Sequence, residues 1–389
     1  MLNSENQSVA VPHLASAAQQ QPFGLYIHVP FCDGKCPYCD FYSMRGSEER
    51  MNQYTDSIIE AIKSYGDKMG RAADTLYFGG GTPNLLGARR ITSLIAAARS
   101  SFVLENAEIT LEVNPAEDLD EFLKAVHSAG ANRLSIGLQS ANEEELRLLG
   151  RRHTAAQAEK AVRTARDAGF SNISLDLMLG IPQQTPQSLL RSIEYCAQAG
   201  VQHISAYLLK IEPHTAYDKN REQFQFPDDD EASGLYLLAC EALEKQGFCQ
   251  YEISNFAKPG YESQHNLKYW HCEEYLGLGP AAHSFMDGKR FYYDRNLNQF
   301  IRGCNPEPDG QGGDFEEYAM LAMRLTQGLE EHRCRERFGH GIPAHVMRAA
   351  KRYEKPGFTV CTDNGFHFTQ TGFLVSNTLI AEILYDNLG

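Results

Sequence analysis

Three cysteines stand close together near the beginning of the chain, Cys32, Cys36 and Cys39, in the run FCDGKCPYCDFY. Thiolates presented by a short loop are the ligands that soft metals and iron–sulfur clusters prefer. A cubane [4Fe–4S] cluster that is held by only three thiolates keeps one iron open, and an open iron can bind a further ligand. The spacing therefore predicts a [4Fe–4S] cluster with one vacant coordination position.

Other uses of these thiols fit the sequence less well. A zinc site would want a fourth Cys or His at matching spacing, and His28, in an apolar run before Pro30, suits that geometry poorly. Disulfides are not expected in a chain without a secretion signal. The remaining cysteines are scattered singly, as is typical of reduced intracellular thiols: Cys196, Cys240, Cys249, Cys272, Cys304, Cys334 and Cys361.

Composition excludes several classes of protein. The chain has 389 residues, 42% hydrophobic and 22% charged, which predicts a large globular unit with a smaller one beside it. A net charge of −14 argues against nucleic acid as the main partner. No apolar run approaches the roughly 18–20 residues that cross a bilayer, so we do not expect an integral membrane protein. Residues 1–22 have neither Lys nor Arg and predict a disordered tail rather than a targeting peptide, which favours a cytoplasmic location.

The elements that must position the cysteines alternate between strand and helix. Apolar runs predict six strands, separated by amphipathic stretches that predict helices. This order is typical of a parallel sheet with helical crossovers, so the expected fold class is α/β, an open, partial (β/α)6 TIM-like barrel. The expected strands are 25–29, 74–78, 108–113, 133–138, 172–179 and 202–209, and the expected helices are 48–65, 91–102, 118–129, 143–149, 155–168 and 187–199.

Unusual residues follow five successive strands. Cys32, Gly81, Glu112, Gln139 and Asp176 all lie at or near the carboxyl end of a predicted strand. Parallel barrels build their sites at that one end, from residues on many strands. We therefore expect these five residues to converge.

The rest of the chain has a different pattern. A helix is expected from about 227 to 246, a strand at 251–256 and a glycine-rich turn at 276–283. The run NPEPDGQGG (305–313) predicts a linker. We expect three parts: the tail (1–22), the barrel unit (23–304) and a small helical or winged-helix-like unit (314–389). The last unit has expected helices at 315–326, at 344–353 and from 375, and strands at 358–361 and 366–369.

The cysteine run resembles the radical S-adenosylmethionine (SAM) enzymes. Five further runs, LYIHVPFC, YFGGGTP, LEVNP, NRLSIGLQS and DLMLGIP, resemble their oxygen-independent coproporphyrinogen III oxidase branch, over nearly all of residues 24–389. In that family three cysteines bind a [4Fe–4S] cluster, and SAM chelates the fourth iron. Reduction then cleaves SAM to a 5′-deoxyadenosyl radical. The resemblance thus implies two cofactors, the cluster on Cys32, Cys36 and Cys39, and SAM beside it.

The resemblance also implies a SAM site. Glu112 and the carbonyls of the GGG run would accept hydrogen bonds from the SAM ammonium, and Arg151 would pair with its carboxylate. Gln139 and Asp176 would bond the ribose hydroxyls. Taken singly, such residues are more often a tight turn, a solvated or helix-capping carboxylate, or a surface pair. The interpretation therefore rests on their occurring together at strand ends with the cysteine loop. The full set, which includes two tyrosines beside the cluster and adenine, is Tyr26, Tyr38, Gly80, Gly81, Thr82, Glu112, Gln139, Arg151 and Asp176.

Two features favour the haem chaperone (HemW-type) subfamily of this branch. The oxidase pattern has a fourth cysteine two residues after the third, and here that position is Phe41. The chain also carries HNLKYW (265–270), in which an imidazole could ligate haem iron and aromatic rings could stack on the macrocycle. The alternative for His265 is a hydrogen-bonded core histidine. Competing ligands nearby are His271, Cys272 and His283.

The expected function is therefore that of a cytoplasmic haem chaperone. It would bind a [4Fe–4S] cluster, SAM and haem, and pass haem to acceptor haemoproteins, membrane-associated ones among them. The alternative is an oxygen-independent coproporphyrinogen III oxidase, an activity that Phe41 disfavours. A third option is a radical enzyme that opens or alkylates haem. The sequence leaves open whether the chain is an enzyme, whether SAM is cleaved, and the oligomeric state.

Overall fold

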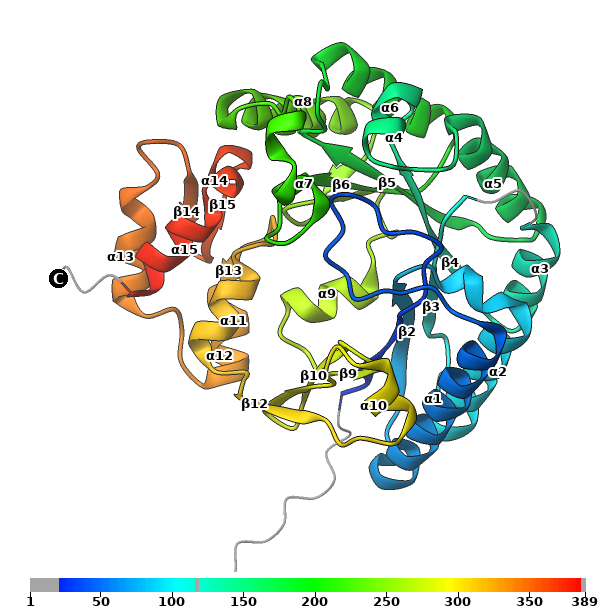
Figure 1. Cartoon of the computed structure of the whole chain (residues 1–389). Helices are drawn as coiled ribbons and strands as arrows, with labels where there is room; N and C mark the ends of the chain where they lie inside the picture. Colours follow the sequence, from blue (N-terminus) through cyan, green and yellow to red (C-terminus); the bar gives the residue numbers. More distant parts are fainter. Residues whose placement is uncertain (1–20, 116–118, 386–389) are drawn as a thin grey trace, which may run out of the picture.

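A twelve-stranded mixed sheet forms the centre of the molecule (Figure 1). The computed structural model describes residues 21–115 and 119–385. Within them the strand order is β12-β11-β10-β9-β1-β2-β3-β4-β5-β6-β8-β7, and the two edge strands do not pair, so the barrel is open. The parallel strands are β1 (Phe23–Val29), β2 (Ala73–Gly80), β3 (Glu108–Val113), β4 (Arg133–Gln139), β5 (Asn172–Leu179), β6 (His203–Leu208) and β9 (Tyr275–Leu278).

Helices cover the convex face of this sheet (Figure 1). Their apolar stripes face the strands, and side-chain caps close their ends: Ser47 accepts from the backbone N–H of Arg50 at the start of the first helix, and Gly70 ends it in the left-handed conformation. The crossover helices are α1 (Glu48–Met69), α2 (Gly87–Ser101), α3 (Asp120–Ser128), α4 (Glu143–Leu148), α5 (Ala155–Asp167) and α6 (Pro186–Gln198), followed by α8 (Asp229–Lys245). Short helical segments are η1 (Pro83–Leu86), α7 (Ala216–Lys219), η2 (Arg221–Gln223) and α10 (Leu297–Ile301).

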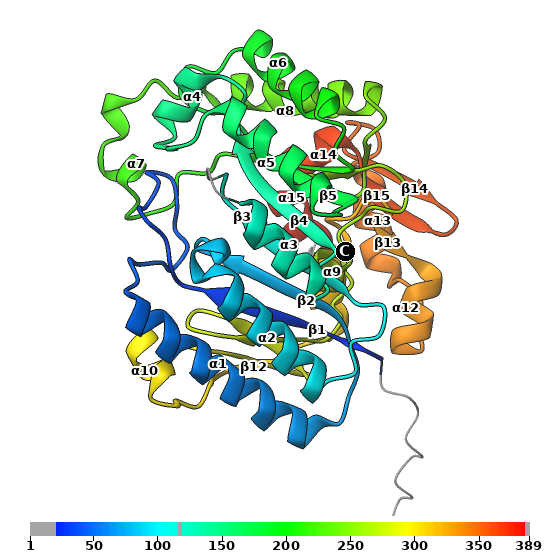
Figure 2. The ribbon, with the colours of Figure 1, turned by 90° about the vertical axis from the view of Figure 1, so that its right-hand side faces the viewer.

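One helix, α9 (Gln264–Trp270), lies on the concave side of the sheet, inside the arc of strands (Figure 1). The Nζ of Lys268 on α9 lies 2.9 Å from Asp74 Oδ2 and 3.1 Å from the carbonyl oxygen of Pro22, at the amino ends of β2 and β1. This helix therefore fills the amino end of the barrel. The loop that carries the cysteines lies at the opposite end, where the strands finish (Figure 2).

The last part of the chain forms a small unit beside the barrel (Figure 1). Its three-stranded antiparallel sheet has the order β13-β15-β14. The elements are α11 (Phe315–Ala322), β13 (Leu329–Glu330), α12 (Glu331–Phe338), α13 (Ala344–Arg352), β14 (Thr359–Thr362), β15 (Gly365–Phe368), α14 (Gln370–Leu374) and α15 (Ser376–Tyr385).

The predicted α/β open barrel is confirmed. All six predicted strands are present, and β3 and β5 have the predicted ends. The predicted tail lies mostly outside the described residues, as does the predicted start of the helix at residue 118, and the division into units stays a prediction. No helix in the described part of the chain is long and apolar enough to cross a membrane.

Two predictions for the later chain are wrong. The expected linker at 305–313 contains β12 (Glu307–Gln311), which pairs with β11 (Lys289–Tyr292) at the edge of the main sheet. The expected strand at 251–256 is two short ones, β7 (Cys249–Gln250) and β8 (Asn255–Ala257). The helix expected from 375 corresponds to α15, which begins at Ser376, whereas α14 before it was not expected. The turn expected at 276–283 is confirmed only in part, because residues 279–282 connect two strands but 276–278 belong to β9 and residue 283 begins β10 (His283–Met286). Strands this short are stabilised by pairing with distant segments, so local periodicity does not reveal them.

Candidate functional site

The cysteine loop follows β1 and is closed at its base by backbone hydrogen bonds. The N–H of Cys32 donates to the carbonyl of Met44, and the N–H of Met44 donates to that of Pro30, both at 2.9 Å. Within the loop the N–H of Cys39 donates to the carbonyl of Cys36 at 3.1 Å. All three thiols are half-buried. The loop therefore presents them at the carboxyl end of the barrel.

Two later segments hold this loop in place. The N–H of Tyr217 on α7 donates to the carbonyl of Pro37 at 2.9 Å. After α4, the guanidinium of Arg152 donates to the carbonyl of Asp33 at 3.2 Å, and a Cβ added to Gly150 would lie only 2.8 Å from the Pro37 ring. The loop is thus clamped by parts of the chain far away in sequence.

Polar donors face two of the sulfurs. Arg151 Nη1 lies 3.8 Å from Cys36 Sγ, and the Thr82 hydroxyl donates to Cys32 Sγ at 3.4 Å. A cation and a hydroxyl so placed suit sulfur atoms that carry negative charge when they bind a metal, and burial raises the pKa of the Cys39 thiol. Three thiols on one loop with such donors fit a thiolate-held cluster. Over residues 21–115 and 119–385, no three His, Cys, Asp or Glu side chains stand ready to hold a single metal ion.

Arg151 links the cysteine loop to the ends of β3 and β4. Its Nη2 donates to Asn114 Oδ1 at 2.7 Å and to the carbonyl of Gly137 at 3.2 Å. A Cβ added to Gly137 would lie 2.9 Å from Gln139 Nε2 and 3.1 Å from Arg151 Nη2, so these side chains meet above this glycine. Gln139 has a left-handed backbone (φ 71°), unusual for a residue with a side chain. The predicted Arg151 and Gln139 are therefore brought together.

Asn114 is a site residue that the sequence reasoning missed. Its amide donates to Thr82 Oγ1 at 2.8 Å while its oxygen accepts from Arg151, so it joins the residues near two of the cysteines. In the sequence Asn114 directly follows the predicted strand 108–113, within the run LEVNP, and is not among the predicted site residues. Its place at a carboxyl end, like that of Glu112, was the signal that could have revealed it.

Glu112 is held from two sides. Its Oε1 accepts from the Tyr77 hydroxyl and its Oε2 from the backbone N–H of Gly80, both at 3.0 Å. Burial, followed by the negative charge of Asp176, raises the pKa of Glu112 to about 7. A cation placed beside this carboxylate would therefore be bound with unusual strength, because it removes the cost of a poorly solvated charge.

The glycines of the GGGTP run permit close packing at this point. Gly80 has a φ of 109°, and a Cβ there would lie 2.5 Å from the His28 ring. A Cβ on Gly81 would collide with the backbone of Phe31 and Val29. Only glycine fits either position, which brings the run against β1 and the cysteine loop.

The remaining predicted residues lie around these. Asp176 accepts from Ser135 Oγ at 2.9 Å, and burial raises its pKa. Tyr38 packs against Leu149, Met178 and Ile181. Tyr26 lies deeper, with its hydroxyl 3.1 Å from His28 Nδ1 and its ring beside that of Tyr77. Tyr26 therefore lies beside the tyrosine that bonds Glu112.

His265 lies apart from the cysteine loop. It is 1% exposed, and both ring nitrogens are engaged: Nδ1 with Thr75 Oγ1 and Nε2 with the Tyr269 hydroxyl, each at 2.7 Å. Burial lowers its pKa to about 3, so the ring is neutral. With both nitrogens occupied it has no lone pair for iron, and the prediction of a haem ligand disagrees with this arrangement. The geometry is that of the alternative, a hydrogen-bonded core histidine.

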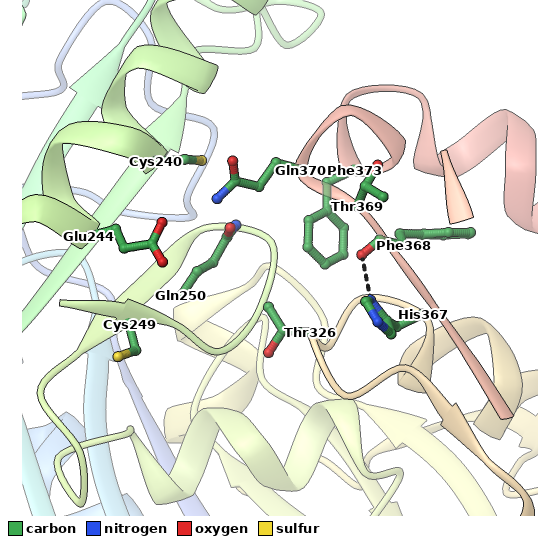
Figure 3. Close-up of a pocket in the computed structure, with 10 residues that line it drawn as sticks. All are labelled: Cys240, Glu244, Cys249, Gln250, Thr326, His367, Phe368, Thr369, Gln370 and Phe373. Carbon is green, nitrogen blue, oxygen red and sulfur yellow. Dashed lines mark hydrogen bonds between the residues drawn. The ribbon is translucent and has the colours of Figure 1, made fainter. Parts of the chain in front are cut away.

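A separate cavity of about 280 Å³ lies between the barrel and the small C-terminal unit (Figure 3). The imidazole of His367 faces it with Nδ1 tied to the carbonyl of Phe368 at 3.0 Å. It lies away from the cysteine loop, and none of its residues is among the predicted site residues. Its other lining residues are Cys240, Glu244, Cys249, Gln250, Thr326, Thr369, Gln370 and Phe373.

Comparison with known proteins identifies relatives along most of this chain. The radical SAM superfamily pattern matches residues 26–196. The chain is 30% identical to a haem chaperone HemW of Lactococcus lactis, over 95% of this chain and 99% of the relative. It is 38% identical to that of Escherichia coli, over 79% and 83% of the two chains. Among solved structures, the coproporphyrinogen III oxidase HemN of Escherichia coli, at 22% identity, superposes with a TM-score of 0.81 over 94% of this chain and 91% of that one, a likeness of fold.

Proposed function

Because this chain belongs to the HemW family of haem chaperones within the radical SAM superfamily, we propose that it binds a [4Fe–4S] cluster, SAM and haem and delivers haem to haemoproteins. The acceptors would include membrane-associated proteins, and the site of action would be the cytoplasm. The observation that carries the proposal is the similarity to these chaperones along most of both chains, joined to a three-thiol loop clamped at the carboxyl end of the barrel.

Each site residue has a defined part in this proposal. Cys32, Cys36 and Cys39 would hold the cluster, which together with SAM supplies reductive cleavage to a carbon radical when both are bound. The carboxylate of Glu112 would hold the SAM ammonium, which offsets the cost of keeping that carboxylate charged while buried. Arg151 would pair with the SAM carboxylate and keep its contact with Cys36. Since Asn114 bonds both Arg151 and Thr82, it would fix the spacing between these two groups.

The remaining polar residues would orient the nucleoside part of SAM. Gln139 ends β4 and Asp176 lies in β5, three residues before the end of that strand, and we propose that both bond the ribose hydroxyls. Tyr38 would cover the cluster and the adenine, because it packs on Met178 and Ile181 at the mouth of the barrel. Tyr26 would support the site from below through His28.

Anaerobic turnover separates this proposal from an oxidase. Protein reconstituted with iron and sulfide would be mixed with coproporphyrinogen III, SAM and a reductant, and in parallel with haem and an apo-haemoprotein. We expect stoichiometric haem binding, transfer of haem to the acceptor, and no protoporphyrinogen IX. Formation of protoporphyrinogen IX at a catalytic rate would overturn the chaperone proposal.

The same assay with Phe41→Cys restores the cysteine of the oxidase pattern. Phe41 is 65% exposed, so the substitution leaves the core untouched. We expect the variant to keep haem transfer and to stay inactive toward coproporphyrinogen III, because one thiol does not create a substrate site.

A further inference from the structure

We propose that His265 is a positioning residue for the SAM site: through Tyr77 it holds Glu112 in place, so that the HNLKYW helix acts on SAM rather than on haem iron. The inference rests on the proposed function, since it takes Glu112 to be the partner of the SAM ammonium. It starts from the placement of α9 inside the barrel, where the helix contacts β2.

Two hydrogen bonds fix the imidazole of His265. His265 bridges the hydroxyl of Thr75 on β2 and that of Tyr269 one helical turn away, each at 2.7 Å. Thr75 is fully buried. An imidazole with both nitrogens bound cannot rotate without breaking one bond, so its plane is fixed.

The fixed ring supports Tyr77. The two rings stack with centroids 5.1 Å apart and an interplanar angle of 27°. From that position the Tyr77 hydroxyl donates to Glu112 Oε1 at 3.0 Å. Gly79 makes the approach possible, because a Cβ there would lie 2.9 Å from both the Tyr77 ring and Glu112 Oε1. The imidazole thus positions the Tyr77 ring, and the Tyr77 hydroxyl positions the carboxylate of Glu112.

Anchors at both ends keep α9 from shifting. At its start the carboxylate of Glu108 accepts from the backbone N–H groups of Gln264 and His265, at 3.2 and 3.1 Å. Toward its end Lys268 pairs with Asp74 at 2.9 Å and with Glu273 at 3.1 Å. A helix held in this way serves as a rigid base on which Tyr77 rests.

Removal of the His265 imidazole should therefore change how firmly the Glu112 carboxylate is held. Without the imidazole Tyr77 keeps the neighbouring ring of Tyr26 but loses its closer stacking partner. Its hydroxyl is then held less firmly toward Oε1, while Oε2 keeps the N–H of Gly80. The carboxylate would then be less well placed and less well stabilised in its charged form, and a cation would bind to it more weakly.

The test compares SAM binding to reconstituted protein by equilibrium dialysis under anaerobic conditions. The variants are His265→Gln, Tyr77→Phe and the double variant, with His345→Ala as the control, since His345 is exposed on α13 in the small C-terminal unit. We expect each single variant to bind SAM about tenfold more weakly, as for one lost hydrogen bond to a charged group. The double variant should be no weaker than either single one, because both interrupt the same path. Circular dichroism and iron content would show that each variant is folded and loaded.

Haem binding provides the second readout. The Soret band of the haem complex should be the same for wild type and His265→Gln. If that variant bound SAM like the wild type while its Soret band shifted or vanished, His265 would be a haem ligand and the inference would be wrong. Additive losses in the double variant would also overturn it. Failure of the wild-type protein itself to bind SAM would instead overturn the proposed function.

Discussion

The two ends of the barrel differ in what their polar side chains are used for. At the carboxyl end the thiols are half-buried, and Arg151 and Thr82 direct donors at their sulfurs. At the amino end His265 is buried with each nitrogen bonded within the protein. Both ends carry a distinctive sequence run, CPYC or HNLKYW. A sequence run rich in possible ligand residues therefore marks a binding site only where the structure leaves their donor or acceptor atoms available to a bound ligand.

The largest effect is expected at the carboxyl end. Cys36→Ser removes one of three ligands, and the protein should lose essentially all of its cluster and brown colour after anaerobic reconstitution. Iron and sulfide analysis measures this. The matched control is Cys196→Ser, because Cys196 is fully buried in α6, away from the loop. Equal iron in the two variants would mean that the loop does not hold the cluster.

The amino end should respond in stability rather than in iron content. Lys268 is 4% exposed and bonds Asp74, Glu273 and the carbonyl of Pro22. Lys268→Met should lower the free energy of unfolding by about 2–3 kcal/mol, because it leaves these partners without a cation. Urea unfolding measures the loss.

The control for this prediction is Lys245→Met, which breaks an exposed pair with Glu241 on α8. Such a pair contributes little, so no loss beyond experimental error is expected. Reconstituted iron should be unchanged in both variants. If Lys268→Met lost its cluster while Lys245→Met kept it, the amino end of the barrel would also be needed for cluster binding, and the proposed difference between the two ends would be wrong.

Arg151 and Arg152 sharpen the comparison within the carboxyl end. Arg151→Gln should weaken SAM binding by about tenfold or more, since a charge-assisted pair is lost. Arg152→Gln should have little effect on SAM binding, because Arg152 is exposed and its guanidinium bonds the backbone carbonyl of Asp33. Calorimetric titration of reconstituted protein with SAM separates the two. Equal losses would point to a general effect of positive charge.

The smallest effect concerns pH. Burial raises the pKa of Glu112 from 4.5 to about 7, so the folded protein holds this proton more tightly than the unfolded chain does. The contribution of Glu112 to stability is therefore fully present below about pH 4.5 and is lost as the pH rises through about 7. Between about pH 5 and about pH 8 the apoprotein should lose on the order of 1–2 kcal/mol relative to Glu112→Gln. Unfolding curves at several pH values test this, and a pH-independent difference would contradict it.

Much of the architecture followed from local patterns. The six strands from β1 to β6 are long enough for their apolar residues to mark them, and parallel pairing then puts every carboxyl end at one edge. That rule alone placed Cys32, Gly81, Glu112, Gln139 and Asp176 near one another. It did not predict Asn114, which was treated as the end of a strand although it bonds both Arg151 and Thr82.

The short elements could not be found in the same way. Strand β12 consists entirely of exposed residues, and its run of Pro and Gly has the composition of a linker. It is a strand because β11 pairs with it. The same holds for β9, which is a strand through its parallel pairing with β1.

The sequence by itself determined the chemistry that this chain can offer: three thiols on one loop, and a row of polar residues at strand ends. Only the tertiary structure decided which polar side chains remain available to a ligand and which are already hydrogen-bonded within the protein. Thr75 and His265 stand 190 residues apart, and their hydrogen bond depends on α9 lying inside the barrel. Local pattern indicates which face of an element is apolar, but packing between distant segments sets the partner of a buried polar atom. In His265 both ring nitrogens are engaged in hydrogen bonds, so the lone pair that haem iron would need is already in use.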